Sequence, residues 1–213
     1  MNENYGSKRN FFKNYSYDIT KLFINQIGIT IFSLVLYTAV GSIKDESLSA
    51  KITTVMSVFA VIFFYSLLYT AAWDFGARDK IRIDGGKLEG SVFTGLKMSL
   101  IANIPNFALA FLSTLFIGLY IVTGVDGFYT AFGIFNLLLR FLCAMFIGVL
   151  QAVFSFLATA DGDSQQALIY FFCQSVGYLV VPTLTVGITH LGYTLGFKEK
   201  RILKFMAPEK RAK

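Results

Sequence analysis

Charged residues are scarce in this chain of 213 residues, and their scarcity excludes an ordinary soluble domain. Asp, Glu, Lys and Arg make up 15% of the sequence, whereas soluble proteins carry about 25%. Apolar residues reach 55%, and the mean hydropathy is +0.60. This composition is typical of an integral membrane protein.

Residues that bind metals or form disulfides are also few. The two cysteines, Cys143 and Cys173, lie in apolar stretches, which favours buried thiols over a disulfide framework. The single histidine, His190, lacks the companions of a zinc site, which has about four ligands. The sequence contains no P-loop, GxSxG, HExxH or CxxC motif. We therefore expect no metal and no cofactor, and we assign no catalytic residue.

Long apolar segments predict an all-α, polytopic membrane bundle, because a spanning helix needs about 20 apolar residues. Five such segments occur, at residues 21–43, 52–75, 95–122, 129–158 and 167–197. The expected organisation is an interfacial arm over residues 1–20, a membrane domain over 21–197 and a basic tail over 198–213.

The distribution of Lys and Arg predicts an orientation. These residues gather in the arm, in a connector at 76–97 and in the tail, and the positive-inside rule places all three in the cytoplasm, here of a bacterial inner membrane. Five simple crossings would leave the tail outside, so one segment must be broken or re-entrant. Pro105 and Pro182 mark the candidate breaks. The segment with Pro105 is favoured, because Asn103 and Asn106 can satisfy the freed backbone groups.

Polar and small residues recur at helical spacing and predict one polar face for each of four segments. The rows are Gln26, Thr30, Ser33 and Tyr37; Ser99, Asn103, Asn106, Ala110 and Ser113; Asn136, Arg140, Ala144, Gly148 and Ala152; and Gln174, Tyr178, Thr185 and Thr189. Two interpretations stay open: the rows hold the helices together, or they line a path for a solute. The expected helix-packing positions are Ala144, Gly148, Ala152, Gly192 and Gly196.

Arg140 is the strongest single indication of a site. A charge at the centre of a span costs at least about 2.5 kcal/mol, and no Asp or Glu lies within the apolar core of any segment. Arg140 therefore needs hydrogen-bond acceptors, an anion or a carboxylate from a partner. The candidate ligand-binding residues are Arg140, Asn136, Asn103, Asn106, Gln174 and Tyr178.

The end of the second segment is expected at the level of the lipid headgroups. Trp73 is typical of that level, and Asp74, Arg78 and Asp79 are spaced for local ion pairs along a helix.

Three functional hypotheses follow. The first is a transport component, a permease or channel-like subunit, with a polar site around Arg140 and an anionic or zwitterionic solute. The second is a non-catalytic subunit or regulator that binds helices of another membrane protein or of a second copy. The third is a membrane-embedded lipid enzyme. Each involves the lipid bilayer and none involves nucleic acid, because the positive residues lie beside apolar segments.

Overall fold

The computed structural model describes residues 3–87, 91, 93–157 and 164–200, and all regular structure among them is helical. The all-α prediction is confirmed. Most of the expected basic tail and part of the expected connector lie outside the described residues.

Within these described residues, four helices are long and apolar enough to cross a membrane. They are α1 (Glu3–Val40), α2 (Glu46–Asp84), α4 (Ile104–Thr123) and α7 (Ser164–Phe197). The shorter elements are α3 (Thr94–Ala102), α5 (Asp126–Leu142), η1 (Ala144–Phe146), α6 (Ile147–Phe154) and η2 (Ser155–Leu157). The α5 helix and the segment from Ala144 to Leu157 meet at a bend of 90°.

Local sequence explains several helix ends. Asp45 caps α2, because its carboxylate accepts a hydrogen bond of 3.0 Å from the Leu48 amide. Gly124 ends α4 with a φ of +68°, a backbone conformation that glycine adopts without strain. Pro105 lies in the first turn of α4, where its missing amide hydrogen removes no helical bond.

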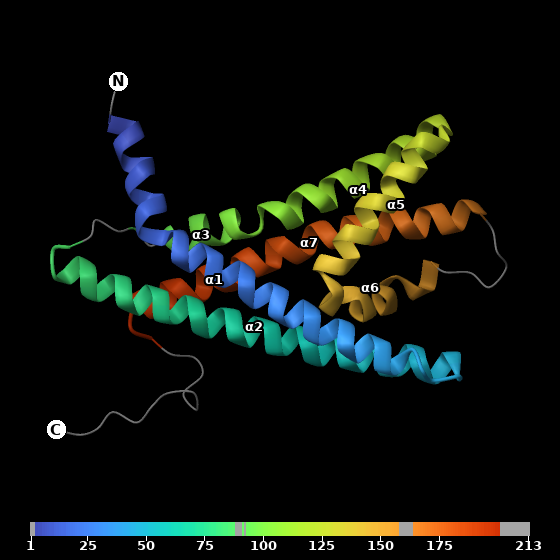
Figure 1. Cartoon of the computed structure of the whole chain (residues 1–213), viewed down its shortest axis with the longest axis horizontal. Coiled ribbons are helices and arrows are strands. Elements are labelled where there is room, and N and C mark those ends of the chain that lie inside the picture. The colour runs from blue at the N-terminus through green and yellow to red at the C-terminus, as the bar shows by residue number, and fades with distance from the viewer. Residues whose placement is uncertain (1–2, 88–90, 92, 158–163, 201–213) are drawn as a thin grey trace.

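The helices alternate in direction between two ends of the bundle (Figure 1). The start of α1, the end of α2, the start of α3 and the end of α7 lie toward one end of the bundle, and we call this the basic end. Sixteen of the nineteen Lys and Arg residues belong to chain segments attached to it, 1–21, 78–97 and 198–213. The opposite end holds the short links after α1 and α4.

The bent pair of α5 and α6 does not reach the basic end. In Figure 1, α5 enters from the opposite end, and α6 leads back toward that end after the bend. The pair therefore has the shape of a re-entrant hairpin, beside four helices that are long and apolar enough to cross. An even number of crossings returns the end of α7 to the side on which α1 begins.

One segment is sharply bent, but it is the fourth segment and not the favoured third. The third segment is interrupted at Asn103, next to Pro105, yet α4 alone is long enough to cross. Pro182 lies inside α7 without a break. The 90° bend falls at Cys143 in the fourth segment, where side chains of other helices bind the freed backbone groups.

The charged stretch from residue 76 is not the exposed connector that its composition predicts. It begins as the last turns of α2, which continues to Asp84. Phe75, Gly76 and Asp79 are buried, because this part of α2 packs against α7. Only the residues that follow Asp84 connect α2 to α3.

The core lies where α2 and α7 pack together, with Phe64, Leu68 and Phe75 of α2 and Tyr178 and Tyr193 of α7 all buried. The outer faces of the long helices carry exposed large apolar side chains, including Ile31, Phe59, Ile62, Phe111 and Val180. A soluble monomer does not expose so much apolar surface. The fold is that of an integral membrane protein.

Candidate functional site

The tip of the re-entrant hairpin is held by side chains from α1 and α2. Thr30 donates a hydrogen bond of 2.8 Å to the Leu142 carbonyl, and Gln26 reaches the same oxygen at 3.4 Å. Ser57 donates to the Met145 carbonyl. These contacts satisfy carbonyls that the bend frees, which allows non-helical backbone to exist at membrane depth.

The start of α6 is bound in the same way. The Tyr37 hydroxyl accepts a hydrogen bond of 3.1 Å from the Gly148 amide, and Ser57 Oγ accepts one of 3.2 Å from the Val149 amide. A shallow hollow with no room for a water molecule lies beside these contacts, lined by Ser33, Leu36, Tyr37, Met56, Ser57 and Ala60. This hollow is not lined by Arg140.

Three amide side chains form a buried group next to the tip. Gln26 and Asn106 exchange two hydrogen bonds, of 3.0 and 2.8 Å, and Asn106 also donates to Asn103 Oδ1 at 2.9 Å. Asn103 in turn donates at 2.9 Å to the Ser99 carbonyl, one turn before the interruption between α3 and α4. The amide group thereby joins α1 to both sides of that interruption.

Arg140 lies in the last turn of α5 and is half-buried. Its guanidinium donates to Gln174 Oε1 on α7, and Gln174 donates at 3.3 Å to the Tyr170 hydroxyl. Gln174 and Tyr178 are fully buried. Among the described residues no carboxylate pairs with Arg140, and its contact is the amide oxygen of Gln174.

Two hydrogen-bonding groups of the Arg140 site have no hydrogen-bond partner within the described chain. Arg140 Nε and the Tyr178 hydroxyl are buried without a hydrogen-bond partner there, and Tyr178 lies within electrostatic range of Arg140. Both can donate a hydrogen bond. The Arg140 group can therefore offer one positive charge and two free donors to a water molecule or an anion.

The predicted ligand-binding residues thus separate into two groups. Asn103 and Asn106 belong to the amide group, and Arg140, Gln174 and Tyr178 form the second. Cys143, which is fully buried, lies between them: its Sγ is 4.0 Å from Asn106 Oδ1, and it is within electrostatic range of Tyr178.

The remaining predicted residue, Asn136, is buried one turn before Arg140. The prediction did not include Gln26, Thr30, Ser57 or Cys143. Gln26 and Thr30 belong to a polar row at helical spacing, a signal that could have placed them in the site.

The small residues of α7 pack against α2 within this chain. A Cβ added to Gly196 would lie 2.0 Å from the Trp73 carbonyl oxygen, and one added to Gly192 would lie 2.7 Å from the Tyr69 oxygen. These distances show that the two backbones touch.

The small residues expected to pack on the fourth segment lie partly in the interior and partly on the surface. A Cβ on Gly148 would lie 2.6 Å from the Thr53 oxygen of α2, and Ala144 is fully buried, whereas Ala152 is exposed. Most of the expected packing positions are therefore occupied by contacts within the monomer.

The residues expected at the headgroup level make longer-range contacts than predicted. Arg78 forms an ion pair with Asp18 of α1, which corrects the expectation of local pairs around Asp74. Asp79 is fully buried and accepts a hydrogen bond of 2.9 Å from the Tyr193 hydroxyl of α7. Trp73 Nε1 donates at 2.7 Å to the Lys200 carbonyl.

Asp74 itself is exposed. The local pairs that the described structure contains at this end of α2 are Arg82 with Asp79, at 3.9 Å, and Lys80 with Asp84, at 2.6 Å. Asp18 and Arg78 are 60 residues apart in the sequence. Spacing along one helix cannot reveal such a partner.

Comparison with known proteins finds no protein family, no curated protein and no solved structure that matches this chain.

Proposed function

We propose that this protein is a transport component, a permease or channel-like subunit, with an anion-binding site at Arg140. The observation that carries the proposal is the re-entrant hairpin, whose tip meets polar side chains of α1, α2 and α4 inside the bundle. Broken helices at membrane depth are typical of proteins that bind solutes or ions there.

The chemistry of the Arg140 group supports an anionic or zwitterionic solute. Arg140 brings a positive charge, and its Nε and the Tyr178 hydroxyl have hydrogen bonds to donate. A carboxylate or phosphate accepts such bonds, and its charge compensates the arginine in a medium of low dielectric constant.

We further propose that the basic end faces the cytoplasm of a bacterial inner membrane. Its excess of Lys and Arg supports this orientation under the positive-inside rule.

The second hypothesis, a subunit that binds partner helices, has less support. Gly148, Gly192 and Gly196, which were its expected contact positions, are packed against α2 of the same chain.

Replacing Arg140 with an uncharged residue should weaken solute binding without unfolding the protein. In detergent, some member of a panel of small carboxylates, amino acids, phosphate and sulfate should raise the melting temperature of the wild type. Arg140→Gln should weaken that binding by about tenfold or more, the value of a lost hydrogen bond to a charged group.

Two further variants define this test. Arg140→Lys should retain part of the binding, and Lys51→Gln, which removes an exposed positive charge near the start of α2, should retain all of it. A panel without any stabilising solute, or equal stabilisation of Arg140→Gln, would contradict the proposal.

A further inference from the structure

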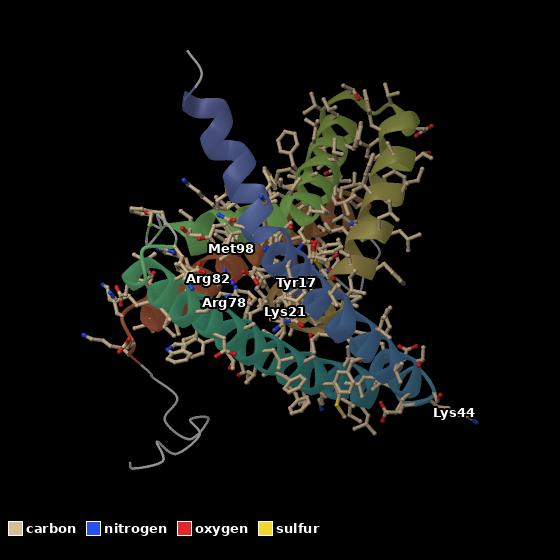
Figure 2. All side chains as sticks on the ribbon, turned by 60° about the vertical axis from the view of Figure 1, so that its left-hand side comes forward. Tyr17, Lys21, Lys44, Arg78, Arg82 and Met98 are labelled. Carbon is tan, nitrogen blue, oxygen red and sulfur yellow. The ribbon has the colours of Figure 1, made fainter. Side chains whose placement is uncertain are left out.

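Three cationic side chains gather at the basic end where α1 passes α2. Lys21 Nζ of α1 lies 5.5 Å from the centroid of the Phe75 ring, and Arg78 Cζ of α2 lies 5.3 Å from the same centroid. Arg82 follows Arg78 by one helical turn. Figure 2 shows Lys21, Arg78 and Arg82 together with Tyr17, far from Lys44 at the other end of α1.

The apolar runs of both helices place this group at the level of the lipid phosphates. Residues 22–40 of α1 and 52–73 of α2 are uncharged helical runs of 19 and 22 residues. At 1.5 Å per residue the two runs span about 28 and 33 Å, close to the thickness of about 30 Å of the hydrocarbon core. Lys21 precedes the first run and Phe75 follows the second, so both lie at the membrane boundary.

The acidic residues nearby do not compensate all three cations. Arg78 pairs with Asp18, but its Nε is buried without a partner in the described chain. Arg82 is 3.9 Å from Asp79, whose other oxygen is bound by a tyrosine hydroxyl. For Lys21, the contact that the structure describes is the Phe75 ring.

Three positive charges thus face two carboxylates, which leaves one uncompensated charge and an unused N–H donor. A lipid phosphodiester carries one negative charge and accepts several hydrogen bonds. It can therefore compensate the extra positive charge and accept a hydrogen bond from the free N–H group. The apolar surface for its acyl chains is present as well: Ile24, about one turn deeper on α1, is 58% exposed.

We propose that Lys21, Arg78 and Arg82 bind the phosphate of an anionic phospholipid at the basic end. The lipid lies against α1 and α2, and its phosphate joins cations from both helices. A zwitterionic lipid is disfavoured, because the same cations repel its ammonium group. This site is separate from Arg140 and does not depend on the transport function.

The test measures lipid binding to the full chain in a neutral detergent. Short-chain phosphatidylglycerol should raise the melting temperature at concentrations at which phosphatidylcholine of equal chain length has little effect. Lys21→Gln and Arg82→Gln should each weaken the phosphatidylglycerol affinity about fivefold, the contribution of one basic residue near an anionic surface. Arg78 is left intact, since its ion pair with Asp18 joins the helices.

Lys44→Gln is the matched control, because it removes one positive charge at the opposite end of α1, and it should leave the phosphatidylglycerol affinity unchanged. The proposal is overturned if phosphatidylcholine stabilises equally, or if Lys21→Gln and Arg82→Gln both bind phosphatidylglycerol as the wild type does. Inorganic phosphate that protects as well as phosphatidylglycerol would identify a free-phosphate site and would contradict the lipid assignment.

Discussion

Gly196→Ala should destabilise the protein by about 3 kcal/mol, the upper range for overpacking an interior. The added Cβ would lie 2.0 Å from the carbonyl oxygen of Trp73 and 2.8 Å from its carbonyl carbon. These are backbone atoms of α2, so no side chain can rotate away, and α2 must separate from α7. Close backbone approach is a main source of association between membrane helices. Thermal and denaturant unfolding in detergent would measure the loss.

Gly187→Ala provides the matched control on the same helix. Gly187 is exposed, and a Cβ there would meet nothing within 4 Å. Alanine favours a helix by about 1 kcal/mol relative to glycine, so this variant should be as stable as the wild type or slightly more. If Gly196→Ala is as stable as Gly187→Ala, the described contact between α2 and α7 is wrong.

The second large effect is expected at Asn106, the centre of the amide group. Asn106→Leu should cost about 2–3 kcal/mol, because it leaves oxygens of Gln26 and Asn103 without their donor in a buried place. The free energy of unfolding in detergent would measure this cost. Asn25→Leu, a half-buried amide next to Gln26 in sequence, should change it much less.

A double variant separates the effect of the hydrogen bonds between Gln26 and Asn106 from the effect of replacing each side chain. Gln26→Leu combined with Asn106→Leu removes both partners of the reciprocal hydrogen bonds, which can be nearly neutral. The two effects should therefore be less than additive, with a coupling of about 1 kcal/mol or more. Strict additivity would mean that Gln26 and Asn106 do not contact each other.

The sequence predicts the elements of this fold well, because each long apolar run is a property of one segment alone. The runs that contain Gln26, Asn106 and Gln174 become membrane helices, and these polar side chains turn inward as their spacing predicts. Side chains that can form hydrogen bonds are driven toward one another in lipid.

The bend at Cys143 could not be predicted in the same way. The residues around it, Leu142 to Met145, include no proline or glycine. The bend is stabilised by Thr30 and Ser57, which lie on helices about 90–110 residues earlier in the chain. Pro105 and Pro182 gave a stronger local signal, yet one lies in a first turn and the other leaves α7 continuous.

The candidate site was predicted in part. The sequence identified Arg140, Asn106 and Gln174, but it could not show that they belong to two groups separated by Cys143, because that division depends on how α1 and α7 pack around the hairpin. The ion pair of Asp18 with Arg78 was missed for the same reason.

The most direct test of the four crossings and the re-entrant hairpin is the reaction of single cysteines with a membrane-impermeant maleimide in sealed, oriented vesicles. Lys87→Cys, Val125→Cys, Gln166→Cys and Lys198→Cys would each be placed in a chain that carries Cys143→Ala and Cys173→Ala. We expect Lys87→Cys and Lys198→Cys to react from one side, the cytoplasmic side, and Val125→Cys and Gln166→Cys to react from the other. If Val125→Cys and Gln166→Cys react from opposite sides, the hairpin is a fifth crossing and the topology described here is wrong.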